Sequence, residues 1–128
     1  MSSFEQKSGV FVVRYDTPEA LSPERQLDLE AALRASARER PVGIVFVVDP
    51  AVQMVDHTVP DYWLGITTDP SVRIAALAVV TTRPAVSVAT RGFSAANLLR
   101  GAPVTVKPFN DEAAAVAWAS GVVAGAKA

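Results

Sequence analysis

Three segments of the chain are continuously apolar and rich in β-branched residues. Val42–Val48 and Ile74–Val80 show no alternation between polar and apolar positions, and Val104–Val106 is a shorter example. Strands that are covered on both faces have this pattern. When such strands alternate with helices, they favour a mainly parallel sheet with crossover connections. We therefore expect the first two segments to be buried, central strands.

A hairpin is predicted at the start of the chain. Phe4–Lys7 and Val10–Tyr15 have strand character, and Ser8-Gly9 lies between them. Glycine adopts positive φ without steric penalty, so this pair suits a tight turn. We expect the strand Phe4–Lys7 to lie antiparallel at or near one edge of the sheet.

Two helices are predicted in the first half of the chain. The first helix is predicted to begin at Ser22, a hydroxyl N-cap that is followed by proline and glutamate. Pro41 is predicted to end this helix. A second helix is expected over Thr58–Ile66, with Thr58 as its cap. Val59 and Ile66 should face the core, whereas Tyr62 or Trp63 should keep part of its ring accessible.

Two further helices are predicted in the second half. The third runs from Pro84 to a glycine stop at Gly101, and the fourth is capped by Asn110. The resulting order is ββαβαβαβα, an α/β fold with a mixed five-stranded sheet and helices packed against it. We expect one domain over residues 1–128, with a frayed tail over about 124–128.

Composition removes several classes of function. The chain has 128 residues, no cysteine and a net charge of −1, which excludes a disulfide framework, a thiolate metal site and a cysteine nucleophile. The basic residues form no concentrated stripe, so we expect no nucleic-acid partner. The first ten residues lack the features of a signal peptide, and no apolar run is long enough for a membrane span. We predict a cytoplasmic protein.

The predicted order resembles the STAS domain, in its stand-alone form similar to the anti-sigma-factor antagonist SpoIIAA. The resemblance depends on the opening hairpin, on the strand Gly43–Val48 that ends in Asp49, and on the run from Val104 through Phe109-Asn110-Asp111-Glu112 to Trp118. None of these motifs is catalytic. The resemblance implies a regulatory adaptor without enzymatic activity, which binds a protein partner around the loop and helix after the middle strand.

Two further expectations come from this resemblance. Many family members carry a phosphorylatable serine shortly after an aspartate, but residues 50–55 contain no hydroxyl group, and Thr58 is the nearest candidate phosphosite. The same side chain is also suited to be a plain N-cap. Related SpoIIAA-like proteins resemble lipid carriers, which implies a cavity for an apolar ligand.

The loop after the middle strand contains the most varied chemistry. Asp49, Asp56 and His57 are suited to a metal site, or to an aspartate that orients a histidine base. A lone histidine beside loop acids is more often solvated, and no nucleophile motif accompanies it. We therefore predict no catalytic residue, no metal and no cofactor, and a small hydrolase or metal enzyme is the third hypothesis.

The leading hypothesis is a protein-binding site on this loop and the helix that follows it. Arg83 and Arg91 are expected to complete its rim. The predicted partner-binding residues are Met54, Asp56, His57, Thr58, Tyr62, Trp63, Arg83 and Arg91. The second hypothesis is a carrier or sensor that encloses an apolar small molecule or lipid between the sheet and the helix Thr58–Ile66. The oligomeric state is left open, with a weak homodimer as one alternative.

Overall fold

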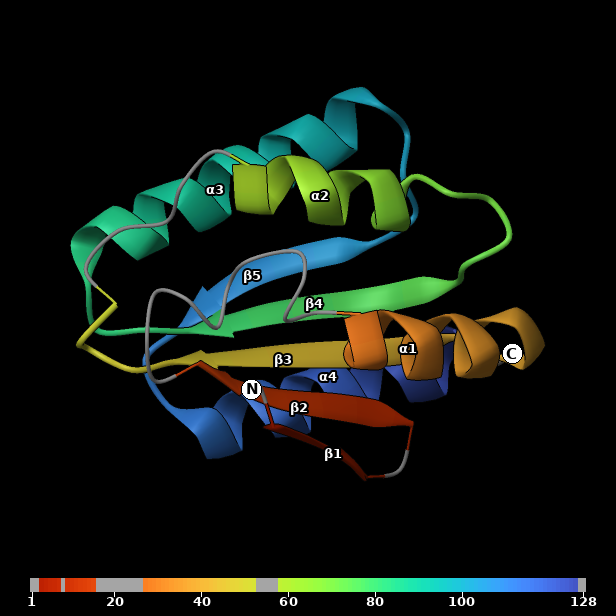
Figure 1. The fold of residues 1–128 in the computed structure, drawn as a ribbon, viewed down its shortest axis with the longest axis horizontal. Helices are drawn as coiled ribbons and strands as arrows, with labels where there is room; N and C mark the ends of the chain where they lie inside the picture. Colours follow the sequence, from red (N-terminus) through yellow and green to blue (C-terminus); the bar gives the residue numbers. More distant parts are fainter. Residues whose placement is uncertain (1–2, 8, 16–26, 53–57, 127–128) are drawn as a thin grey trace.

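The computed structural model describes residues 3–7, 9–15, 27–52 and 58–126. Strands and helices follow one another in the predicted order (Figure 1). Their bounds are β1 (Ser3–Lys7), β2 (Val10–Tyr15), α1 (Leu27–Glu39), β3 (Val42–Val48), α2 (Thr58–Thr67), β4 (Ile74–Val80), α3 (Pro84–Leu99), β5 (Thr105–Phe109) and α4 (Glu112–Ala126). The α/β fold class and the alternation of strands and helices are confirmed.

The strands of the sheet lie in sequence order, β1-β2-β3-β4-β5. Strands β2 to β5 form a parallel group of four, and β1 pairs antiparallel with β2 at the outer edge. Gly9 makes the turn between β1 and β2 with a φ of 81°, which glycine adopts without strain. As predicted, β3 and β4 are internal strands and almost all of their side chains are buried.

The two faces of the sheet are covered differently. Because the parallel strands follow one another in one direction and crossovers are right-handed, the connecting helices fall on the same face. Helices α1, α2 and α3 lie on this side, which we call the three-helix face (Figure 1). Helix α4 follows the last strand and packs on the opposite side, the α4 face, through Ala115, Ala119 and Val123.

The end of the chain differs from the prediction in three details. Strand β5 continues to Phe109, because Pro108 lies on an edge strand that needs no outer backbone donor. The cap of α4 is Asp111, not Asn110, since its carboxylate accepts a hydrogen bond from the Ala114 amide at 2.9 Å. Helix α4 extends to Ala126, so residues 124–126 belong to it and not to a frayed tail. Alanine favours helix even where it is exposed.

The predicted start of the first helix at Ser22 lies outside the described residues, and the remaining predictions on fold agree with the structure. Helix α3 runs from Pro84 to Leu99, and Gly101 follows with a φ of 71°, as the glycine stop predicts. Helix α2 begins at Thr58, as expected, and ends one residue later than predicted. None of the helices in the described residues is long and apolar enough to cross a bilayer.

Candidate functional site

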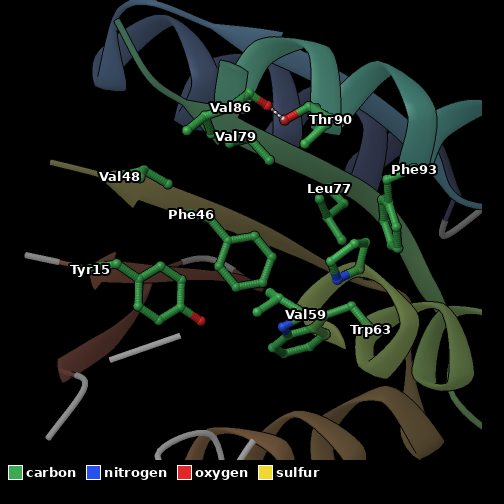
Figure 2. A pocket seen from close by; sticks show the side chains of 12 residues that line it. Tyr15, Phe46, Val48, Val59, Trp63, Leu77, Val79, Val86, Thr90 and Phe93 are labelled. Atoms are coloured by element: carbon green, nitrogen blue, oxygen red, sulfur yellow. Dashed lines mark hydrogen bonds between the residues drawn. The ribbon is translucent and has the colours of Figure 1, made fainter. Parts of the chain in front are cut away.

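An apolar pocket lies between the sheet and helices α2 and α3 (Figure 2). Its floor is formed by the carboxyl-terminal halves of β2, β3 and β4, and its walls by residues 59–63 of α2 and 86–93 of α3. Its volume is about 70 Å³. The lining residues are Tyr15, Phe46, Val48, Val59, Pro60, Trp63, Leu77, Val79, Val86, Ala89, Thr90 and Phe93.

Three aromatic rings in contact form one wall of the pocket. Tyr15 and Phe46 stack with ring centroids 5.5 Å apart, and the edge of Phe46 meets Trp63 at 4.9 Å. The rings come from three elements, β2, β3 and α2, so they tie the helix to the sheet. Offset and edge-on aromatic pairs are stabilised beyond the area that they bury. This wall is therefore a rigid, preformed surface.

The opposite wall is formed by small residues of α3. Ala89 and Thr90 face the sheet where a larger side chain would fill the space. The Thr90 hydroxyl donates to the Val86 carbonyl at 2.8 Å, so its only donor is used within the helix. Consequently Thr90 offers mainly its methyl group to the pocket.

The pocket is lined almost entirely by hydrocarbon groups. Among the described residues, the lining contains no histidine, lysine, arginine, aspartate or glutamate, and its ionisable group is the Tyr15 phenol. Such a surface binds apolar groups by removing them from water. It has none of the acid, base or nucleophile pairs that hydrolytic chemistry requires.

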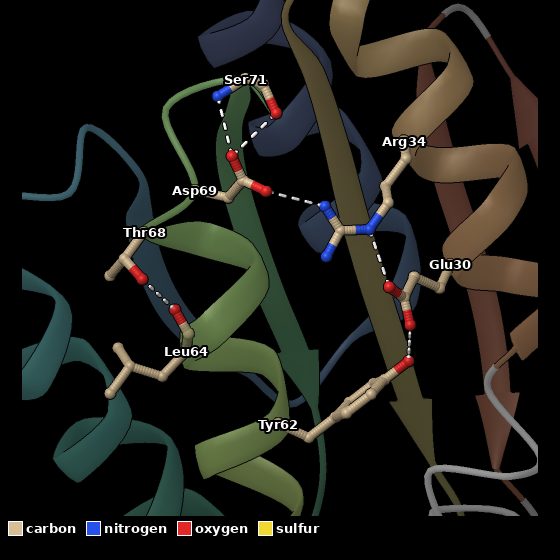
Figure 3. A network of polar contacts seen from close by, with 7 residues as sticks. All are labelled: Glu30, Arg34, Tyr62, Leu64, Thr68, Asp69 and Ser71. Atoms are coloured by element: carbon tan, nitrogen blue, oxygen red, sulfur yellow. Dashed lines mark hydrogen bonds and ion pairs between the residues drawn. The ribbon is translucent and has the colours of Figure 1, made fainter.

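A polar network fixes the outer side of α2 (Figure 3). The Tyr62 hydroxyl donates to the Glu30 carboxylate, and Arg34 binds Glu30 and Asp69 at 2.7 and 2.9 Å. The amide and hydroxyl of Ser71 donate to the other Asp69 oxygen at 2.9 and 2.8 Å. The network joins α1 to α2 and to the turn after it, so it holds α2 above the pocket.

The charges in this network shift the pKa values of its members. The two bonds from Ser71, followed by Arg34, lower the pKa of Asp69 to about 2. The hydrogen bond from Tyr62, together with Arg34, lowers the pKa of Glu30 despite its partial burial. Burial, and then the bond to Glu30, raises the pKa of Tyr62. At neutral pH the carboxylates are charged and the phenol is a donor.

A buried hydrogen bond joins α2 to α3. The Thr67 hydroxyl donates to the Asn97 side-chain oxygen at 2.5 Å, and the Asn97 amide donates to the Phe93 carbonyl at 2.9 Å. Both polar residues are buried. Polar groups in a core are stable only when they are paired in this way. The pair fixes the spacing of the two helices at the end farther from the pocket.

The predicted loop residues lie mostly outside the part of the chain that the structure describes. Met54, Asp56 and His57 belong to residues 53–57, which are not described, so their predicted roles are untested. Thr58 is the first residue of α2, but its side chain is also outside the description. Its roles as a cap and as a phosphosite remain predictions.

The two aromatic residues of α2 have different environments. Tyr62 is half-buried, which agrees with the expectation that one ring keeps part of its surface accessible. Trp63 is 4% exposed and packs in the core, so its predicted place on a partner-binding surface is wrong. The contact with Phe46 on β3 draws its ring inward. Ile66 faces the core as predicted, at 2% exposed.

The two predicted rim arginines are separated along α3. Arg83 occupies the N-cap position of the helix without a side-chain capping bond, and its Nε donates to the Pro50 carbonyl at 2.7 Å. Arg91 lies eight residues further on and is exposed on the outer side. Asp49 pairs with neither, because its carboxylate accepts from the Ala51 amide at 2.9 Å. The structure therefore does not bring the predicted rim together.

Most of the pocket residues carry no sequence signal that marks them as part of a pocket. Phe46, Leu77 and Phe93 were expected only as core positions, and Ala89 was one of several alanines. One feature of the α3 sequence could have indicated a pocket. The inward side of this helix changes from the small residues alanine and threonine to phenylalanine within one turn. Whether such a step leaves a pocket depends on the strand opposite, which spacing along one chain does not reveal.

Comparison with known proteins gives no relative of this chain. No protein family, no curated protein and no solved structure matches it significantly. Within the described residues, no three histidine, aspartate or glutamate side chains are grouped closely enough to hold a metal ion. The pocket is therefore the feature of the described structure on which a function can be based.

Proposed function

We propose that the chain is a non-catalytic regulatory domain that binds a small apolar molecule, or the apolar end of a larger one, between the sheet and α2. The observation that carries this proposal is the composition of the pocket. Aromatic and aliphatic side chains from five elements line it, and none of the described lining residues is acidic or basic. The resemblance to SpoIIAA-like proteins supports the same function, because it implies an apolar cavity.

The size of the pocket limits the ligand. An engineered apolar cavity of about 150 Å³ takes up benzene or xenon, whereas this pocket has a volume of about 70 Å³. It is therefore suited to a short alkyl chain, or to the end of a longer one. Such a ligand gains affinity from burial of its methylene groups and not from directed hydrogen bonds.

The hypothesis of a partner site over Met54–Trp63 remains a separate proposal. Its loop lies outside the described residues, and its helix uses Trp63 for the core and Tyr62 for the contact with Glu30. Arg83 is bound to Pro50 at the base of the same loop. These contacts favour α2 as a wall of the pocket over α2 as a free binding surface.

Linear alcohols of increasing length test the proposed function. Trp63 lines the pocket, and Trp118 lies on the other face of the sheet beside Phe109. In a Trp118→Phe variant the remaining tryptophan therefore reports on the pocket. Each added methylene should tighten binding by about 0.8 kcal/mol, roughly fourfold, until the pocket is full.

A filled pocket is the matched control for this titration. Ala89→Leu places an isobutyl group in the pocket from α3, whereas Ala117→Leu makes the same change on the exposed side of α4. We expect Ala89→Leu to abolish alcohol binding while the fold is kept, and Ala117→Leu to leave it unchanged. Equal binding by both variants, or affinities that do not depend on chain length, would refute the proposal.

A further inference from the structure

The outer side of α3 is apolar and exposed, although the helix buries its opposite side. Val88, Leu98 and Leu99 are 66%, 80% and 88% exposed. They are three of the four large hydrophobic residues that are exposed in the described part of the chain, and Leu27 is the fourth. Single exposed leucines are common, but a group on one helix marks a surface that binds another molecule.

The exposed residues of α3 are spaced as in a helix–helix interface. Successive steps of three, four, three and four residues connect the positions Ala85, Val88, Gly92, Ala95 and Leu99, and all five are exposed. This is the heptad spacing that places a seam of residues against a second helix. The buried residues Val86, Thr90, Phe93 and Asn97 occupy the opposite side.

Gly92 at the centre of this seam has no explanation within the fold. A Cβ placed there would meet no atom within 4 Å, so no neighbour in this chain requires glycine. Glycine in the middle of a helix is less favourable than alanine. A small residue at the centre of a seam lets the backbone of a second helix approach closely.

The charged side chains on α3 and in the segments that flank it in the sequence are all positive. Residues 70–110 contain Arg73, Arg83, Arg91, Arg100 and Lys107 but no aspartate or glutamate, although the chain has more acidic than basic residues. Arg91 and Arg100 are exposed, and neither has an ion pair among the described residues. A partner that covers the seam therefore meets these arginines, and no carboxylate of α3 itself.

We propose that the seam Ala85–Leu99 on α3 docks an amphipathic helix of a partner protein, with aliphatic anchors on one side and carboxylates beside them. The exposed leucines supply the apolar contact, and Arg91 and Arg100 select the acidic flanks. A second copy of α3 is a poor occupant, since it would bring arginines to arginines. The proposal does not depend on the pocket, although the inner side of the same helix lines it.

A displayed library of helical peptides tests the choice of partner without assuming its charge. Leucine, isoleucine and valine occupy the heptad positions a and d, and all residues are allowed elsewhere. Selection on the full chain should enrich glutamate and aspartate at the positions that flank the apolar seam. Selected peptides without an acidic bias, or no selected peptide at all, would overturn the proposal.

Gly92→Ala provides a test with two opposite effects. It should raise the melting temperature of the protein, because alanine favours helix, and weaken binding of the selected peptide at least fivefold, because its methyl group separates the two backbones. Gly65→Ala on α2 is the matched control, since that exposed glycine also has no neighbour within 4 Å of a Cβ. It should stabilise the fold and leave binding unchanged. Equal effects of the two variants on peptide binding would contradict docking of the peptide on the seam.

Further variants measure how much the exposed leucines and Arg91 contribute to peptide binding, and a vesicle assay tests whether the surface binds a membrane instead. Replacement of both Leu98 and Leu99 by alanine should weaken peptide binding at least tenfold, and Arg91→Gln should reduce its dependence on salt. Sedimentation with vesicles of phosphatidylglycerol and phosphatidylcholine tests a membrane instead. Vesicle binding that is lost in the double leucine variant, without any peptide binding, would assign the surface to lipid and refute the proposed helix.

Discussion

The two faces of the sheet are packed with side chains of different size. On the α4 face, Ala76 and Ala78 of β4 meet Ala115 and Ala119 of a single helix. On the three-helix face, large side chains fill the space instead. The largest of them are Phe11, Tyr15, Phe46, Trp63 and Phe93.

The difference explains why this pocket lies on the three-helix face. Small side chains let a straight helix lie close to the sheet along its whole length, and dense packing follows. Large rings shared among three separate helices must fit one another as well as the sheet. Where α3 offers Ala89 and Thr90 opposite the aromatic wall, the fit is incomplete and the pocket remains.

The largest expected effect is at Phe46, where adjacent residues of β3 face opposite sides. Phe46→Ala removes contacts with Tyr15 and Trp63 and should lower the free energy of unfolding by about 3–5 kcal/mol. Val45→Ala removes two methyl groups from the α4 face, where Val45 is fully buried, and should lower it by about 2 kcal/mol. Urea unfolding of the two variants measures both values.

Added benzene tests whether the two variants leave spaces of different size. Phe46→Ala enlarges an existing pocket, so benzene should raise its melting temperature, whereas Val45→Ala leaves a gap too small for the ring. Equal responses of the two variants to benzene would show that the faces do not differ in packing.

The next effect concerns overpacking at Gly43. A Cβ at this position would lie 3.1 Å from a methyl group of Val123 and 3.5 Å from the Ala119 methyl. Gly43→Val should therefore push α4 from the sheet and destabilise the protein by about 1–3 kcal/mol, despite the preference of valine for strands. Thermal unfolding followed by circular dichroism measures the change.

Gly121→Ala is the control for that variant. Gly121 lies on the same helix, with no atom within 4 Å of an added Cβ, so alanine should stabilise α4 by roughly 0.5–1 kcal/mol. If Gly43→Val is as stable as the natural chain, the α4 face is looser than its small residues indicate.

Much of the fold could be predicted because local patterns determine it. The apolar runs of β3 and β4 and the proline and glycine at the ends of α3 each depend on neighbours in the sequence. The cap of α4 was misplaced by one residue, because Asn110 and Asp111 are equally good caps. The hydrogen bond from the Ala114 amide to the Asp111 carboxylate decides between them.

The candidate site could be predicted only in part, because it is assembled from distant segments. The sequence indicated an apolar space beside α2, but it did not identify Leu77 and Ala89 as parts of its lining. Tyr62 and Trp63 share one helical stripe, yet contacts with Glu30 and Phe46 draw the first outward and the second inward. Such choices depend on packing partners from other elements.

The smallest expected effect is the acid sensitivity of the network that joins α1 to α2 on the three-helix face. Asp69 has a pKa of about 2, below its ordinary value of 3.8, so the folded state binds its proton less readily than the unfolded chain. Its contribution to stability is complete above pH 5 or so and is lost as the pH falls toward about 2. The difference in unfolding free energy between the natural chain and Asp69→Asn should therefore be constant at neutral pH and shrink over that acidic range.

Carboxyl carbon chemical shifts, recorded by NMR as a function of pH, measure the cause directly. The Asp69 resonance should titrate near pH 2 in the natural chain. Ser71→Ala removes the hydroxyl donor but keeps the amide donor, so it should raise the pKa of Asp69 part of the way toward 3.8. Arg34→Met should raise it as well, because the Arg34 guanidinium also favours the charged form. A carboxyl that titrates near 3.8 in the natural chain would mean that Arg34 and Ser71 do not hold this carboxylate in solution, and that the pocket is fixed by the aromatic wall and the Thr67–Asn97 bond instead.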